Sequence, residues 1–190
     1  MNGRDSAAWE VHQFLTALGI PYAIIGGVAV QRWGEPRFTQ DVDLTVAAPL
    51  DDPETFVQQV LDRFSPRLED ALTFALRNRV ILVQATNGYN LDIALGLPGY
   101  EDEVIQRAID YELEPGKAVR LCSAEDLIIH KAVAGRSQDV RDIEGIIYRQ
   151  GDVLDVGYIR QWLHGFAEIL GKPAIVELFE SPWRGIRARK

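Results

Sequence analysis

The sequence predicts an α+β fold whose C-terminal part is helical. Strand-like and helix-like patterns alternate up to about residue 121, whereas every pattern from residue 123 onward has helical spacing. The 190 residues include 47% hydrophobic and 25% charged side chains, which are average values for a globular protein, and a chain of this length can bury an apolar core. We therefore expect an α/β core over residues 1–121 and a helical subdomain over residues 122–190.

Charge and cysteine content exclude several classes of protein. The net charge of −8 argues against broad, nonspecific nucleic-acid binding. The single cysteine, Cys122, can form neither an internal disulfide nor a zinc cluster, so we expect a reducing, cytoplasmic location. The first residues lack a basic segment followed by an apolar run, and no stretch reaches the roughly 18 apolar residues that span a bilayer. We expect neither a signal peptide nor a membrane partner.

The elements of the α/β core follow from apolar periodicity and from the residues that interrupt it. Helices are assigned where apolar residues recur every three or four positions, and strands where they alternate or form short β-branched runs. Asp52 and the proline after it open a helix, and the turn signal at residues 86–88 makes the strands around it a hairpin. In chain order we expect a helix at 6–18, a strand at 22–25, a helix at 28–33, a strand at 41–46, a helix from 52, strands at 79–85 and 89–95, a helix at 100–109, and one or two strands through 119–121.

The C-terminal third contains four expected helices. Ser123 and Asp126 resemble a capping box at the start of the first, and a break at residues 135–137 separates it from the second. The third is expected at about 155–170 and the fourth near 174–179. The tail holds Arg184, Arg187, Arg189 and Lys190 without an acid. We expect a frayed end there, with contact to an RNA phosphate as a minority hypothesis.

Two carboxylates carry the main chemical signal. Asp41 and Asp43 stand at i and i+2 on an expected strand, so their side chains project from the same face. Their mutual repulsion is relieved by a divalent cation, and oxygen ligands of this kind suit Mg²⁺ or Mn²⁺. Asp92 lies among apolar residues of a second strand and is the candidate third carboxylate, because a lone buried Asp is unfavourable without a partner.

A glycine pair precedes these acids by fourteen residues. Gly26 and Gly27 connect an expected strand to an expected helix, where backbone N–H groups can approach phosphate oxygens. The sequence lacks the GxxxxGK[ST] pattern of a P-loop and the GxGxxG pattern of a dinucleotide site. The pair therefore points to a phosphate cradle of another kind, beside a metal-binding strand.

These residues resemble a known family. The pattern Gly26-Gly27 … Arg37-x-Thr39-x-Asp41-x-Asp43 is similar to the signature of the DNA polymerase β-type nucleotidyltransferase superfamily. The later Lys131 … Asp139-x-x-Asp142 is similar to the helical segment of its AbiEii-like group, which includes toxins of type IV toxin–antitoxin systems. The likeness covers about residues 20–150. It implies a nucleotidyltransferase-like mixed β-sheet with flanking helices, and transfer of an NMP from an NTP to an acceptor hydroxyl with release of pyrophosphate.

The resemblance also implies roles for individual residues. Asp41 and Asp43 would bind the metal ions, and Asp92 would be the third ligand and general base. Gly26 and Gly27 would hold the β- and γ-phosphates, Lys131 would contact the triphosphate, and Asp139 or Asp142 would orient Lys131 or the nucleoside. Arg37 and Thr39 would belong to the same nucleotide-binding set. One departure is Gly27, because many relatives have Ser after the first glycine; nucleotide affinity would then rest on backbone donors.

Less specific interpretations remain open from the sequence. Asp41 and Asp43 could form a solvated strand face paired with Arg37, the glycines a tight turn, and Lys131 a solvated helix residue. The chain could be a non-catalytic nucleotide-binding or regulatory module, or an interaction protein. For an enzyme, the acceptor could be a small hydroxylated molecule such as an aminoglycoside, a tRNA 3′ end or a protein side chain, and an antitoxin protein could be a partner.

Overall fold

The computed structural model describes residues 1–188, with the side chain of residue 187 left aside, and divides into two units. The α/β unit comprises residues 1–28 and 38–122. The helical unit comprises residues 29–37 together with the chain from residue 123 onward. The expected division after residue 121 did not include the grouping of residues 29–37 with the helical unit.

Hydrogen bonds explain why residues 29–37 belong there. The side chain of Gln150 donates to the carbonyl oxygen of Trp33 at 2.9 Å, and that of Arg149 donates to the carbonyl oxygen of Gly34. A Cβ at Gly145 would lie only 3.1 Å from the backbone nitrogen of Glu35. The chain after residue 33 is thus fastened to a later helix by contacts between residues more than 100 positions apart, which local patterns do not reveal.

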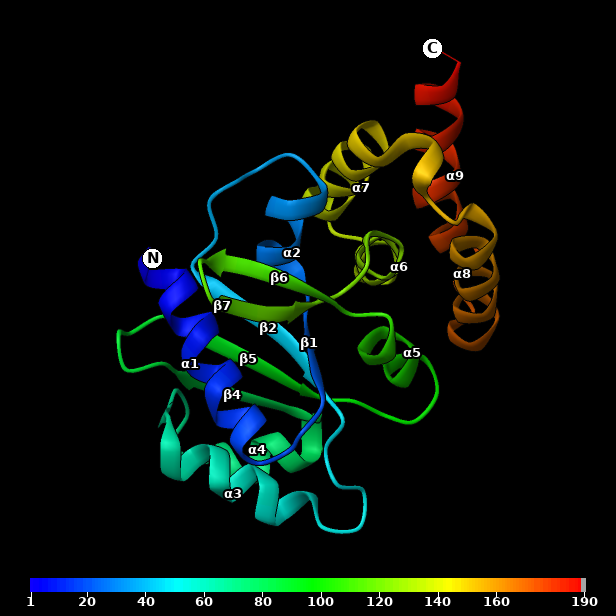
Figure 1. Ribbon diagram of the computed structural model, residues 1–190. Coiled ribbons are helices and arrows are strands. Elements are labelled where there is room, and N and C mark those ends of the chain that lie inside the picture. The colour runs from blue at the N-terminus through cyan, green and yellow to red at the C-terminus, as the bar shows by residue number, and fades with distance from the viewer. Residues whose placement is uncertain (189–190) are drawn as a thin grey trace. The chain divides into compact units, whose positions relative to one another are not determined.

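The α/β unit is built on a mixed sheet, as expected. Among the described residues the sheet has seven strands in the order β3-β4-β5-β2-β1-β7-β6 (Figure 1). Its strands are β1 (Tyr22–Ile24), β2 (Asp41–Val46), β3 (Ser65–Pro66), β4 (Val80–Gln84), β5 (Asn90–Leu95), β6 (Ile109–Glu114) and β7 (Lys117–Leu121). Its helices are α1 (Gly3–Ala17), the start of α2 (Gly26–Trp33), α3 (Pro53–Arg63), α4 (Ala71–Asn78) and α5 (Tyr100–Gln106).

The central strand, β2, sets the geometry of the unit. It runs antiparallel to β1 and parallel to β5, while β4 and β5 form the expected antiparallel hairpin. Val42 and Leu44 on β2 are fully buried, as are Leu91 and Ile93 on β5. The helix α1 packs against β7 and β2, so apolar side chains from helix and strands share one core.

Two parts of this unit differ from the expectation. The sequence pattern did not reveal β3 and α4, because β3 has two residues and α4 only eight, too few for a clear period. The helix expected at 100–109 ends at Gln106, and Ile109 already begins β6. Gly116, at φ +79°, makes the turn between β6 and β7, so the "one or two strands" expected near residue 120 are two.

The helical unit contains the end of α2, then α6 (Ala124–Ala134), α7 (Ser137–Gln150), a short 3₁₀ turn, α8 (Val156–Leu170) and α9 (Ala174–Arg187) (Figure 1). Ser123 caps α6, since its Oγ accepts from the backbone N–H of Asp126 at 3.0 Å. None of the helices that the structure describes has the length and apolar character of a membrane span.

The tail is more ordered than expected. The fourth helix was expected to end near residue 179, yet α9 continues to Arg187 with Pro182 inside it. Arg184 forms an ion pair with Glu177 at 2.8 Å, so a frayed end from residue 181 is wrong. Arg189 and Lys190, and the side chain of Arg187, lie outside the described residues, and the RNA-contact hypothesis stays a prediction.

Candidate functional site

Strand register places three carboxylates on one face of the sheet. Asp43 on β2 stands directly opposite Asp92 on β5, and Asp41 stands opposite Asn90. Opposite residues of neighbouring strands point to the same face, as do residues at i and i+2 of one strand. The expected alternation is present, because the acids are partly exposed while Val42 between Asp41 and Asp43 is fully buried.

Protein partners of Asp41 and of Asp92 are described on this face. Asn90 Nδ2 donates to Asp41 Oδ1 at 2.9 Å, and Arg67 Nη2 forms an ion pair with Asp92 Oδ1. Sequence reasoning missed Arg67. Its backbone N–H donates to the carbonyl oxygen of Leu82, the residue of β4 that is opposite Asp92, so the register of the β4–β5 hairpin brings it to the acid.

The charge on Asp92 is only partly balanced. Burial raises the pKa of Asp92, the Arg67 guanidinium acts against that rise, and the charge of Asp41 adds to it. Carboxylate oxygens are the donors that Mg²⁺ and Mn²⁺ prefer, so the donor chemistry fits the expected ions. The side chains are not gathered around a ready centre, however: in the described part of the chain no group of three or more His, Cys, Asp or Glu residues could hold a metal ion as it stands.

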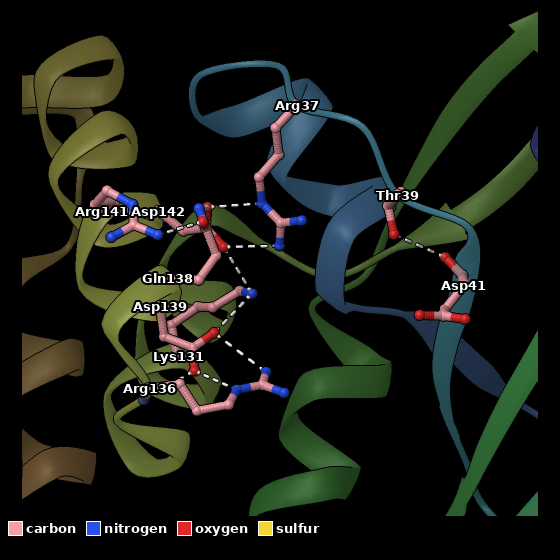
Figure 2. Close-up of polar contacts among 9 residues, drawn as sticks. All are labelled: Arg37, Thr39, Asp41, Lys131, Arg136, Gln138, Asp139, Arg141 and Asp142. Atoms are coloured by element: carbon pink, nitrogen blue, oxygen red, sulfur yellow. Dashed lines mark hydrogen bonds and ion pairs between the residues drawn. The ribbon is translucent and has the colours of Figure 1, made fainter.

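The glycine pair lies against the same strand. Gly26 begins α2 at φ +64°, a conformation that favours glycine, and a Cβ there would overlap the carboxylate of Asp43. A Cβ on Gly27 would lie 2.7 Å from Thr39 Oγ1. Thr39 Oγ1 in turn donates to the backbone oxygen of Asp41 at 3.3 Å (Figure 2). Both glycines therefore leave room for motif residues, which a simple tight turn would not require.

A buried ion-pair network occupies the helical unit (Figure 2). Lys131 Nζ lies 3.0 Å from Asp139 Oδ1 and 2.8 Å from Asp142 Oδ2. Two arginines complete it: Arg37 donates to both carboxylate oxygens of Asp142 at 2.9 and 3.0 Å, and Arg136 Nε donates to Asp139 at 2.7 Å. Each carboxylate thus faces Lys131 on one side and a guanidinium on the other.

The network decides between the interpretations of several residues. Lys131 is 4% exposed, so the alternative of a solvated lysine is wrong, and both expected partners contact it. Arg37, which the sequence assigned to the nucleotide-binding motif, forms an ion pair with Asp142. Burial by itself raises the pKa of Asp139 and Asp142, but the hydrogen bonds from Arg136, Arg37 and Lys131 outweigh it and hold both pKa values below the ordinary range.

A groove of about 990 Å³ also lies within the helical unit, lined by the 35–37 segment, α7 and α9. Four carboxylates and two guanidiniums line it: Glu35, Asp142, Glu144 and Glu177, with Arg37 and Arg141. The ring of Tyr148 is 65% exposed at this groove. Its volume is in the range of small-molecule sites, and its lining has an excess of negative charge.

Comparisons with known proteins identify the fold. No family model matches the chain, and no curated protein matches it. The chain is similar to the structure of an antigenic nucleotidyltransferase-like protein from Paracoccidioides brasiliensis, with 19% identity, 92% of this chain and 91% of that chain covered, and a TM-score of 0.52. It is also similar to the lincosamide antibiotic adenylyltransferase LnuA in its lincomycin-bound form, with 12% identity, 77% and 98% covered, and a TM-score of 0.50.

At these identities the similarity shows the fold alone. The chain has a nucleotidyltransferase-like α+β fold with a mixed sheet and a helical C-terminal part, as the resemblance in its sequence implied. The solved structures reported above do not distinguish the AbiEii-like group from other branches of that fold.

Proposed function

We propose that the protein is a metal-dependent nucleotidyltransferase that moves an NMP from an NTP to an acceptor hydroxyl and releases pyrophosphate. The observation that carries the proposal is the register of β2 and β5, which puts Asp43 opposite Asp92 on the face that also holds Asp41. The close approach of Gly26 to Asp43 supports it, because a phosphate-binding turn beside the acids is what the chemistry needs.

The acids of this face have distinct tasks in the proposed reaction. Asp41 and Asp43 bind Mg²⁺ or Mn²⁺, and Asp92 is the third ligand and takes the proton of the acceptor hydroxyl. The bound cations would supply Lewis-acid stabilisation of the charge on the α-phosphate and the leaving pyrophosphate. The acceptor oxygen bonds to the α-phosphorus while the bond from that phosphorus to pyrophosphate breaks. The backbone N–H groups of Gly26 and Gly27 bind the β- and γ-phosphates.

The buried network has a positioning role in this proposal. Lys131 would have to leave two carboxylates to reach a triphosphate, which is unfavourable for an ammonium group that is 4% exposed. The Arg37 side chain is about one-third exposed, and its guanidinium is held in place by Asp142. We therefore assign phosphate contact to Arg37 and Thr39, with Lys131, Asp139 and Asp142 fixing the position of Arg37.

The groove favours a small acceptor that carries amino groups as well as the reacting hydroxyl. Glu35 and Glu144 can pair with ammonium groups, and Tyr148 offers an exposed ring for a cation or a sugar face. A tRNA end would bring phosphates to a lining with an excess of carboxylates, which disfavours it. The antibiotic substrate of the structural neighbour LnuA is in keeping with an acceptor of this size.

Two other assignments use the same residues. A toxin of the AbiEii-like group would apply the same chemistry to a tRNA or protein acceptor and have an antitoxin partner. A non-catalytic nucleotide-binding module is favoured by two observations: Arg67 holds Asp92, and the described acids do not form a ready metal centre. Each of these two assignments predicts its own outcome in a labelling experiment, different from that of the proposed enzyme.

The experiment supplies each α-³²P-labelled NTP with Mg²⁺ or Mn²⁺ and offers three acceptor fractions: cationic hydroxylated small molecules, tRNA and soluble protein. We expect label in the small-molecule fraction, and its loss in Asp43→Asn. Asp62→Asn is the matched control, because Asp62 is an exposed acid of α3 that bonds only Gln58 among the contacts described. Label on tRNA or protein would support the toxin assignment, and metal-independent NTP binding without any transfer would support the non-catalytic one.

A further inference from the structure

One cation already stands on the acid face. The Arg67 guanidinium forms its ion pair with Asp92 where Asp92 is 33% exposed and the Arg67 side chain is 24% exposed. The same carboxylate faces Asp43 across the strand register and is sensitive to the charge of Asp41. Arg67 therefore neutralises the part of the face at which a third metal ligand is required.

The backbone holds Arg67 at this position. Its N–H donates to the carbonyl oxygen of Leu82 at 3.0 Å, and Leu82 is the β4 residue opposite Asp92. One strand, β4, thus lies between the backbone of Arg67 and Asp92 on β5, and the sheet fixes this separation. Movement of Arg67 away from Asp92 requires only side-chain rotation, since the backbone bond does not involve the guanidinium.

The ion pair is incomplete, which makes exchange feasible. Arg67 contacts one oxygen of Asp92 through Nη2, whereas the strongest arginine–carboxylate pairs use two parallel hydrogen bonds. Arg67 Nε is buried and has no hydrogen-bond partner among the described residues. A buried donor without a partner is unfavourable, so the paired state is held less tightly than a bidentate pair would be.

We propose that Arg67 is the resident counter-ion of Asp92, and that a divalent cation must displace it to use Asp92 as a ligand. The inference rests on the proposed metal site and adds a competitor to it. Arg67 then raises the cation concentration at which the site formed by the three acids is occupied, and it offsets one of their negative charges while no divalent cation is bound.

The test is a Mn²⁺ titration of the full chain, with free Mn²⁺ measured by electron paramagnetic resonance, which needs neither nucleotide nor turnover. For Arg67→Gln we expect half-saturation at about fivefold lower Mn²⁺ than for the unmodified protein, the ratio expected for loss of a partly exposed ion pair. Arg63→Gln is the matched control, because it removes the same charge from an ion pair with Glu10 on the α/β unit. It should leave the titration unchanged.

Arg67→Lys guards against a folding defect in the first variant. Lysine keeps the charge without the planar fork, so we expect half-saturation between that of the unmodified protein and that of Arg67→Gln. Unchanged or weaker Mn²⁺ binding in both Arg67 variants would overturn the counter-ion role and leave the metal site standing. If neither the unmodified protein nor any variant binds Mn²⁺, or if Asp43→Asn binds as well as the unmodified protein, the metal site of the proposed function fails as well.

Discussion

Asp43 and Asp92 stand directly opposite each other on two parallel strands at the centre of the sheet. Like charges at opposite positions destabilise a sheet, and apolar residues on both strands would pack without this repulsion. The neighbouring alternate positions of β2 and β5 are indeed filled by buried apolar side chains, so the acids are confined to one face. A strand pair that concentrates charge in this way sacrifices some stability, which is common at sites built for binding.

Replacing one of these acids should therefore separate stability from metal binding. For Asp43→Asn we expect the free energy of unfolding in EDTA to stay the same or rise by up to about 1 kcal/mol, because one opposed charge is removed. The additional stability that Mn²⁺ gives the unmodified protein should disappear. Urea unfolding with EDTA and with Mn²⁺ measures both effects. A loss of more than about 1 kcal/mol in EDTA would mean that Asp43 is primarily a structural residue.

The contact between Gly27 and Thr39 gives a second prediction. A Cβ at residue 27 would lie 2.7 Å from Thr39 Oγ1 and 2.8 Å from its Cβ, so Gly27→Ser forces one of them to move. We expect a loss of about 1–3 kcal/mol in unfolding free energy, the usual range for overpacking. Thr39→Ala combined with Gly27→Ser should recover part of that loss, since the hydroxyl and methyl that the introduced serine side chain would meet are gone. Additive losses in this double-mutant cycle would show that the two positions are not in conflict.

The Lys131 network gives a third prediction, on the stability of the helical unit. Lys131→Met removes the cation shared by Asp139 and Asp142, so two buried carboxylates keep less positive charge to balance their own. We expect destabilisation of roughly 3 kcal/mol, near the low end for broken buried ion pairs, because Arg136 and Arg37 remain. Adding Asp139→Asn should restore part of it. Arg141→Met, which removes an exposed guanidinium from the same unit, is the control and should change stability by less than about 0.5 kcal/mol.

Local sequence patterns predicted most of the elements that hold the candidate site. The period-two alternation at 41–46 predicted β2 and the face of its acids, and the turn signal after residue 85 predicted the β4–β5 hairpin. These features arise within a few residues, where hydrophobic alternation and turn chemistry act. The sequence allowed the hypothesis that Asp92 lies on the same face as Asp41 and Asp43. That Asp92 stands directly opposite Asp43 depends on the pairing of two strands that are far apart in the chain, which local patterns do not encode.

Arg67 shows what local patterns cannot supply. It lies in a short segment between β3 and α4 that has no clear apolar period. It comes close to Asp92 because its backbone bonds Leu82, the β4 residue that stands opposite Asp92. Arg37 is similar, because its partner Asp142 is 105 residues away in the chain. Ion pairs between distant segments depend on tertiary packing, and neither composition nor spacing encodes which of the chain's acids a given arginine will meet.

His130 gives the last prediction, a pH dependence of stability. It lies on α6 with its Nε2 atom buried, and burial lowers its pKa from 6.5 to about 4, with the charge of Asp126 opposing the shift and that of Lys131 adding to it. The unfolded chain therefore binds a proton at this residue between pH 6.5 and pH 4 while the folded chain does not. The stabilising contribution is complete above pH 6.5 and is lost as pH falls to 4, by about 3 kcal/mol in total.

Urea unfolding at half-unit steps from about pH 7.5 to about pH 4.5 measures this loss against His130→Gln, which cannot titrate. Other groups, among them half-buried His12, whose pKa burial also lowers, titrate in both proteins and cancel in the difference. The stability advantage of the unmodified protein over His130→Gln should shrink steadily below pH 6.5. Parallel curves over that range would mean that His130 binds its proton equally well in the folded and unfolded chain, which is incompatible with a lowered pKa for an imidazole whose Nε2 is buried beside Lys131.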